Sequence, residues 1–181
     1  MQSEAHLFWI DLEMTGLNPA TDTILEIASV ITTNELEIVA EGPCFAIYQP
    51  ASVLESMDEW CRINHAKSGL TADVLASTIS LQEACDKTVE FIASYCYPQK
   101  TPLCGNSVHQ DKAFLRRLMP KLNDYLHYRI IDVSTIKELV QRWYPNNPGA
   151  FFEKKSDHRA RADVYASIEE LQQYRTIFFK P

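Results

Sequence analysis

Apolar and polar residues alternate from Leu7 to Met14, which predicts a β-strand with two unlike faces. One face is apolar throughout, whereas the other starts with Leu7 and Trp9 and ends with Asp11 and Glu13. Carboxylates are rarely left unpaired against a protein core. The strand is therefore expected to bring two carboxylates together at its carboxyl end, where open α/β sheets bind ligands.

Further apolar runs predict four more strands. Two runs follow after short connectors, over Ile24–Thr32 and over Glu37–Tyr48, and the second should bend at Gly42-Pro43. Short connectors between such runs favour an antiparallel meander. Two shorter runs, over Pro102–Asn106 and Arg129–Val133, are expected to form later strands.

Apolar residues at helical spacing occur before, between and after these later strands, which predicts helices there. Ser80 and Glu83 form a capping-box pattern that opens a helix at Leu81. Further helices are expected over 111–118, 134–143 and 157–178, the second of them capped by Ser134 or Thr135. Three strands followed by alternating helices and strands indicate an α/β fold, with a mixed five-stranded sheet and helices on both faces.

The composition is that of one globular domain, residues 1–181, with 46% hydrophobic and 23% charged residues. The five glycines are too far apart for the dinucleotide-binding motif G-x-G-x-x-G or for a P-loop, which excludes both. The cysteines number five, an odd count, and form no C-x-x-C motif. Neither a disulfide framework nor a zinc finger is therefore indicated.

The net charge and the lack of targeting signals bear on the cellular location of the protein and on the size of its substrate. The chain start lacks the order of a signal peptide and no apolar run approaches a membrane span, so a cytoplasmic protein without membrane contact is expected. Seventeen basic and twenty-four acidic side chains give a formal net charge of −7. Binding long nucleic acid by counterion release requires basic surface, so a short substrate fits better.

Two more acids and a histidine lie at the edges of apolar helical stripes. Asp111 opens the stripe of one helix, and Asp163 lies within the stripe of the last helix, five residues after His158. Each residue also has an ordinary explanation. The helix dipole favours an acid at the position of Asp111, and His158 fits a solvated or capping residue. Asp11 and Glu13 fit two solvated acids at a strand end.

Four carboxylates in one place repel one another and destabilise the fold, and divalent cations remove that cost. Hard oxygen ligands without cysteine or paired histidine favour Mg²⁺ or Mn²⁺ over zinc. Two such ions about 3.5–4 Å apart can hold the attacking and leaving oxygens of a phosphoryl displacement. A histidine beside them can take a proton from the attacking water.

Three short segments occur in a fixed order: Asp11–Leu17, then Cys104–Ser107 leading to Asp111, then His158 with Ala160 and Asp163. In this order they resemble the three motifs of the DEDDh exonuclease superfamily and, within it, the oligoribonuclease family. The likeness to that family runs from about His6 to Phe178. Its most specific stretches are Ile10–Gly16, Asp58–Trp60 with His65, His127–Arg129 and Asp132–Thr135.

The resemblance implies a ribonuclease H-like fold, a homodimer and two Mg²⁺ or Mn²⁺ ions. It implies 3′→5′ hydrolysis of very short single-stranded RNA, especially dinucleotides, to 5′-mononucleotides. The metal ligands it implies are Asp11, Glu13, Asp111 and Asp163, and the general base is His158. The substrate contacts it implies are Leu17 and Trp60 against the bases, His65 and Ser107 near the substrate, Arg129 and Ser134 at the terminal phosphate, and Tyr128 reaching into the partner subunit's site.

Two positions depart from the family pattern. Ala162 precedes Asp163 where a second acid is frequent, and His109 lies where glycine is common, with its role left open.

On the residues alone, Trp60 is also explained as a core tryptophan. Tyr128 and its neighbour Arg129 are equally explained as a cross-strand surface pair.

Two other functions fit the same motifs less well. A tRNA-trimming or proofreading exonuclease usually grips a longer strand through basic patches, which the charge of −7 and the lack of a Lys/Arg run disfavour. A non-catalytic binding module on this fold would be favoured by the loss of any of the four acids or of His158. All five are present, so the site residues favour the enzyme.

Overall fold

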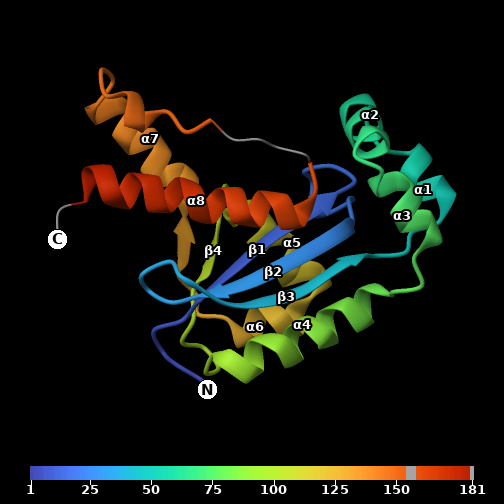
Figure 1. Ribbon diagram of the computed structural model, residues 1–181. Coiled ribbons are helices and arrows are strands. Elements are labelled where there is room, and N and C mark those ends of the chain that lie inside the picture. The colour runs from blue at the N-terminus through green and yellow to red at the C-terminus, as the bar shows by residue number, and fades with distance from the viewer. Residues whose placement is uncertain (154–157, 180–181) are drawn as a thin grey trace.

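A computed structural model describes residues 1–153 and 158–179, and Figure 1 shows a sheet with helices on both of its faces. Across these residues the sheet has five strands in the order β3-β2-β1-β4-β5. β1 is antiparallel to β2 and β2 to β3, whereas β4 is parallel to β1 and β5 to β4. The predicted mixed sheet is confirmed. The strands are β1 Leu7–Met14, β2 Ile24–Thr32, β3 Ile38–Ala46, β4 Leu103–Gly105 and β5 Ile130–Asp132.

The helices differ from the predictions mainly between β3 and α4. Those predicted from helical spacing correspond to α4, α5, α7 and α8, although α8 begins at Ala160, and Asp157 lies outside the described residues. The short helices α1, α2 and α3 were not predicted. The helices are α1 Ala51–Glu55, α2 Glu59–Lys67, α3 Leu70–Ala76, α4 Leu81–Tyr95, α5 His109–Leu118, α6 Pro120–Tyr125, α7 Val133–Trp143, the 3₁₀ turn η1 Pro148–Ala150, and α8 Ala160–Phe178.

The sheet divides the core into two layers, and alternate side chains of β1 belong to opposite layers. Phe8, Ile10 and Leu12 lie in one cluster with residues of α4, α5 and α6. Leu7 and Trp9 lie in the other, with residues of α7 and α8. The predicted alternation along this strand is thus confirmed, and the face that carries the two acids is the one covered by α8.

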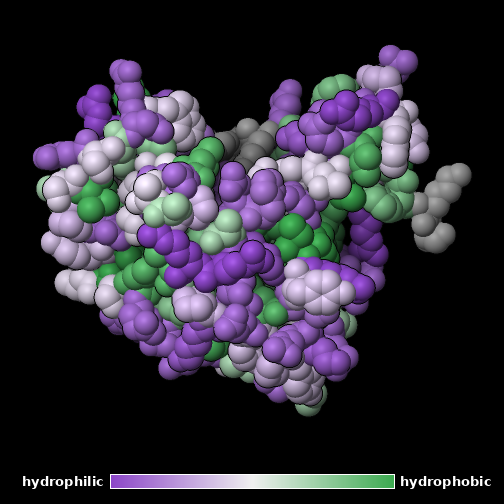
Figure 2. All heavy atoms as spheres, turned by 180° about the vertical axis from the view of Figure 1, so that it is seen from behind, coloured by the Kyte–Doolittle hydropathy of each residue, from purple (hydrophilic) through white to green (hydrophobic). Residues whose placement is uncertain are grey.

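A third apolar cluster attaches α1, α2 and α3 to the sheet. It is built around Leu25 of β2, with Leu54, Met57, Cys61, Leu70 and Val74 from the three short helices and their connectors. Figure 2, which shows the molecule from behind, has a notch in its outline between this helical group and the end of the molecule that carries α7. No helix among the described residues is both long and apolar enough to cross a membrane.

Candidate active site

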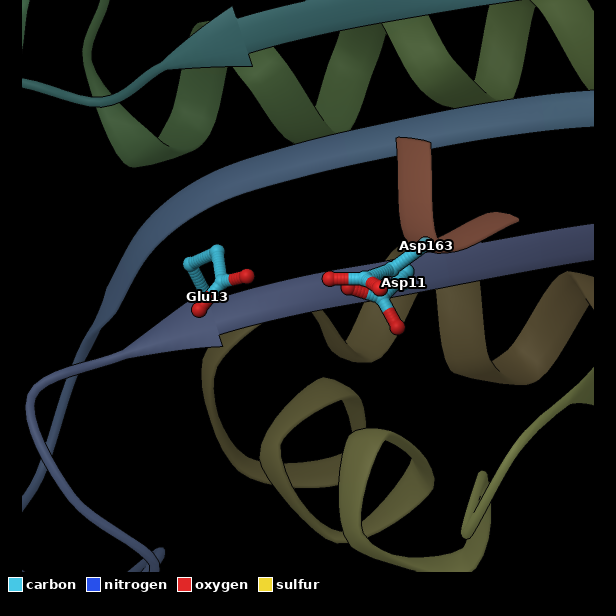
Figure 3. A group of neighbouring side chains, drawn as sticks. All are labelled: Asp11, Glu13 and Asp163. Atoms are coloured by element: carbon cyan, nitrogen blue, oxygen red, sulfur yellow. The ribbon is translucent and has the colours of Figure 1, made fainter. Parts of the chain in front are cut away.

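Asp11, Glu13 and Asp163 form one cluster beside the carboxyl end of β1 (Figure 3). Asp11 and Glu13 lie two residues apart on this strand and therefore point to the same face. Asp163 reaches the same place from the first turn of α8. One carboxylate oxygen from each residue lies within 4.8 Å of the other two. The first and third motifs, about 150 residues apart in the chain, thus meet in space.

Asp111 lies against the edge of β1, next to this cluster. β4 ends at Gly105, so the neighbouring edge of β1 has no strand partner beyond that point. The backbone N–H of Leu12 donates there to Asp111 Oδ1 at 2.9 Å. Burial, reinforced by the carboxylates of Glu13 and Asp132, raises the pKa of Asp111 to about 8. A divalent cation nearby would favour its ionised form.

The turn between β4 and α5 carries the second motif. Gly105 is required there, because a Cβ would lie 2.8 Å from the carbonyl oxygen of Ile10. Ser107 adopts a left-handed backbone conformation with φ of 50°. Its N–H donates to Asp132 Oδ1 and to Ser134 Oγ, each at 2.9 Å. Ser107 and Ser134 therefore lie side by side, with their hydroxyl oxygens 3.1 Å apart.

His109, whose role the sequence left open, contacts Asp132. Its Nδ1 lies 3.1 Å from Asp132 Oδ2. Asp132 also caps α7, accepting from the N–H of Ser134 at 3.0 Å. The prediction that Ser134 or Thr135 caps this helix was therefore wrong, because the preceding acid takes the free backbone donor.

His158 lies two residues before α8 and also has a left-handed backbone conformation, with φ of 49°. Its ring meets the Trp60 ring edge-on, with the ring centres 5.5 Å apart and an interplanar angle of 86°. Trp60 is 60% exposed, which rules out the alternative of a core tryptophan. An exposed indole beside the histidine offers a flat surface for stacking.

Helix α2 turns Trp60 outward and His65 inward. Asp58 caps this helix, because its side chain accepts a hydrogen bond from the backbone N–H of Cys61 at 2.8 Å. The buried His65 donates from Nε2 to the Met14 carbonyl at 2.9 Å, and its Nδ1 lies 3.9 Å from Glu13 Oε2. Burial lowers the pKa of His65, which favours the neutral ring. In that form Nδ1 is a hydrogen-bond acceptor on the side of the acids.

The remaining predicted residues lie on exposed surface. Leu17, in the turn after β1, is 68% exposed. Tyr128 is 73% exposed, and the guanidinium carbon of Arg129 lies 5.2 Å from the centre of its ring. Tyr128 also lines an open cavity of about 650 Å³ together with Lys112 and Arg116, and none of the four acids lines this cavity.

An ion pair that was not predicted from the sequence supports His158. The next residue, Arg159, donates from Nη2 to Glu26 of β2 at 2.6 Å, and Glu26 is buried. The same Nη2 lies 2.9 Å from Asp73 of α3. The backbone that carries His158 is thereby tied to the sheet and to the helices beside Trp60. The sequence does carry one signal for this pair, since Glu26 is the single charged residue of the buried strand β2.

Comparison with known proteins agrees with this arrangement. The family described as Exonuclease matches residues 8–171. The chain is 52% identical to the oligoribonuclease of Marinobacter nauticus over 180 residues, which is 99% of each chain. It is 51% identical to the oligoribonuclease of Vibrio cholerae over 178 residues, 98% of each chain.

Among solved structures, Exonuclease I from Methylocaldum szegediense superposes with a TM-score of 0.74 over 97% of this chain. The identity is only 16%, and this chain spans 41% of that longer protein, so the likeness concerns the fold. The sheet order and the shared fold confirm the expected ribonuclease H-like architecture. With its full-length relatives about half identical, the chain belongs to the oligoribonuclease family of exonucleases.

Proposed function

We propose that this chain removes 5′-mononucleotides from the 3′ end of very short RNA, dinucleotides above all, in a reaction that uses two Mg²⁺ or Mn²⁺ ions. The observation that carries the proposal is the cluster of Asp11, Glu13 and Asp163, with oxygens within 4.8 Å of one another. His158 precedes the helix that supplies the third acid, and Trp60 adjoins His158. The family supplies the substrate class, since its members carry the name oligoribonuclease.

The donor set fits a hard divalent cation. Asp11, Glu13 and Asp163 offer carboxylate oxygens only, the ligands that Mg²⁺ and Mn²⁺ prefer. These three residues would hold the two ions, and Asp111 would complete the set from the edge of β1. When bound, the ions would activate the attacking water and stabilise the leaving oxygen of the phosphodiester.

His158 acts in this proposal as the general base, and a ring nitrogen accepts the proton of the attacking water. The ring rests against Trp60, and the ion pair of Arg159 with Glu26 fixes the backbone beside it. Its position is thus set before the substrate binds. Such preorganisation is what proton transfer at a defined atom requires.

The substrate contacts are proposed at two places around the acids. Leu17 and Trp60 would pack against the bases, since both side chains are exposed and apolar. The buried His65, bonded to the Met14 carbonyl, would lie near the substrate. Ser107, Arg129 and Ser134 would bind the terminal phosphate of the substrate. A dinucleotide carries few negative charges, so one arginine and two hydroxyls are enough to bind its terminal phosphate. This small number of partners also fits a chain with a net charge of −7.

Trp60→Ala should raise KM for a diribonucleotide more than it lowers kcat. Stacking of a base on an aromatic ring contributes about 1–3 kcal/mol, so KM should rise by at least about fivefold. Steady-state kinetics measures both constants. Ile63→Ala, which removes another exposed apolar side chain of α2, is the matched control and should leave KM unchanged. An unchanged KM in Trp60→Ala would count against stacking.

Mg²⁺ or Mn²⁺ should raise the Tm of the metal-free protein. The cation relieves repulsion in the acid cluster, and at about a hundredfold excess over its Kd it contributes about 2.7 kcal/mol. For a chain of this size that corresponds to a rise of about 5–10 °C. Thermal denaturation with EDTA or added cation measures the shift. Asp11→Asn should lose most of this rise in Tm. A wild-type Tm that does not change on adding the cation would contradict the assignment of the acid cluster as the metal site.

We further propose a cytoplasmic homodimer in which each chain, residues 1–181, is a single exonuclease domain. The highly exposed Tyr128 and Arg129 form a stacked pair that is available to a partner subunit. All five cysteines are free thiols, as is usual in a reducing compartment. The exonuclease family match extends over most of the chain, residues 8–171, and supports one domain.

Mixing inactive Tyr128→Ala and Asp111→Ala chains should restore activity if Tyr128 acts in the partner's site. A heterodimer then contains one site with an intact acid set and an intact tyrosine. After random subunit exchange at equal concentrations, about a quarter of the sites should be complete. Activity assays after exchange, verified by native mass spectrometry, measure the recovery. Verified exchange without recovered activity would contradict the role in trans.

The direction of cleavage tests the proposed reaction. A 5′-labelled pentaribonucleotide should shorten one nucleotide at a time from its 3′ end, and EDTA should stop the reaction. The label should leave as a 5′-mononucleotide only in the last step. Early release of a labelled mononucleotide, or cleavage that persists in EDTA, would contradict the proposal.

A further inference from the structure

Leu17 belongs to the turn of residues 15–23, which joins β1 to β2. Two hydrogen bonds close the base of this turn. The N–H of Thr15 donates to the Thr23 carbonyl at 3.0 Å, and the N–H of Thr23 donates to Thr15 Oγ1 at 3.0 Å. A turn that presents an apolar side chain to solvent needs further internal bonds to keep one conformation, because ordering each residue costs entropy.

The half-buried carboxylate of Asp22 supplies these bonds on both sides of Leu17. Its Oδ1 accepts from the Thr15 hydroxyl at 3.2 Å, and its Oδ2 accepts from the backbone N–H of Asn18 at 2.8 Å. The carbonyl of Asn18 accepts in return from the N–H of Asp22 at 2.8 Å. One side chain thus holds the chain before and after Leu17, as short acidic side chains do in turns.

Gly16 leaves the space that this carboxylate occupies. A Cβ at position 16 would lie 2.6 Å from Asp22 Oδ2 and 2.9 Å from its Cγ. Both distances are shorter than a carbon atom tolerates from a non-bonded neighbour. Residues 15–18 are therefore wrapped around the Asp22 side chain, and a larger residue in place of Gly16 would push that side chain out.

We infer that Asp22 is a positioning residue for Leu17, holding the turn in the one conformation in which Leu17 meets a base of the substrate. The inference rests on the proposed contact of Leu17 with a base. Asp22 is not one of the clustered acids Asp11, Glu13 and Asp163, and it acts through its hydrogen bonds rather than its charge. A side chain that is ordered before binding loses less entropy when the substrate arrives.

Asp22→Ala removes both bonds of the carboxylate. We expect KM for a diribonucleotide to rise about fivefold, the size of losing the contact of one methylene group or slightly more. The rise should not exceed that of Leu17→Ala, and the double variant should bind no worse than Leu17→Ala alone. The acid cluster is intact, so kcat should change less than about twofold and the rise of Tm on adding Mg²⁺ should persist.

Asp22→Asn separates hydrogen bonding from charge. The amide oxygen can still accept from the N–H of Asn18, and the NH₂ group can donate to Thr15 Oγ1, whose own proton then turns away. Both connections persist, so KM should stay at the wild-type value. Thr33→Ala is the matched control, because Thr33 Oγ1 accepts two backbone N–H bonds at 3.2 Å in the turn between β2 and β3, at the other end of β2. It should leave KM unchanged.

Gly16→Ala disturbs the same contact from the other side and covers the case that Asp22→Ala does not fold. In the wild-type background it should raise KM to the same extent as Asp22→Ala. In the Asp22→Ala background it should add little, because the carboxylate that the new methyl group would meet is gone.

The outcomes separate the inference from the function beneath it. If Leu17→Ala raises KM, three results would overturn the positioning role: an unchanged KM in Asp22→Ala, a raised KM in Asp22→Asn, or losses that add up in the double variant of Leu17 and Asp22. If Leu17→Ala leaves KM unchanged, the proposed base contact itself is wrong, and the positioning role falls with it.

Discussion

Asp163→Asn should lower kcat on a diribonucleotide at least about a thousandfold, equivalent to about 4 kcal/mol of transition-state stabilisation. The substitution keeps the size of the side chain and removes its charge. Asp163 is buried and its oxygen lies within 4.8 Å of ligand oxygens of Asp11 and Glu13. The loss therefore falls at the centre of the proposed metal site, where a neutral amide is a weaker ligand for a hard cation.

Two measurements separate metal loss from misfolding in this variant. Without cation, the Tm of Asp163→Asn should equal or exceed that of the wild type, because one of several crowded carboxylates has lost its charge. Glu169→Gln changes an exposed acid on the same helix and should keep full activity. Asp163→Asn with more than a tenth of wild-type kcat at saturating Mg²⁺ would refute the ligand assignment.

His158→Ala should lower kcat by about a hundredfold to ten-thousandfold, the range for loss of a general acid or base. The acids remain, so the rise of Tm on adding Mg²⁺ should persist. Loss of rate with retained cation binding is the signature that distinguishes a base from a metal ligand.

His6→Ala is the histidine control for this experiment. The ring of His6 contacts the Tyr95 carbonyl at 2.8 Å, outside the candidate site, so the variant should keep both the rate and the rise of Tm on adding Mg²⁺. A His158→Ala enzyme with a normal rate would remove His158 from the reaction. Loss of the Mg²⁺ effect on Tm would instead assign it to cation binding.

Much of the sheet could be predicted because its central strands carry strong local patterns. The bounds of β1 and β2 are those expected from alternation and from an unbroken apolar run. The helices α1–α3 escaped prediction, since each spans nine residues or fewer and gives no clear helical spacing. Contact with Leu25 of the sheet stabilises them, and a local pattern does not contain that contact.

The site was predictable where acids occupy positions that should be apolar. Asp11 and Glu13 on the Trp9 face of a buried strand are such a case. Glu26 is also such a case, but its partner was not predictable, because Arg159 lies 133 residues away in the chain. The buried Glu170 likewise pairs with Asn106, 64 residues away. Only the fold brings these partners together.

The most direct test of the proposed function is a competition between two substrates. A 5′-labelled diribonucleotide and a labelled twenty-nucleotide RNA are offered together, with Mg²⁺, with Mn²⁺ or with EDTA, and with Asp111→Ala as the inactive control. We predict metal-dependent hydrolysis with a strong preference for the dinucleotide. Equal or faster hydrolysis of the long RNA would contradict a site built for very short substrates, and cleavage of neither RNA in the presence of cation would contradict the enzyme itself.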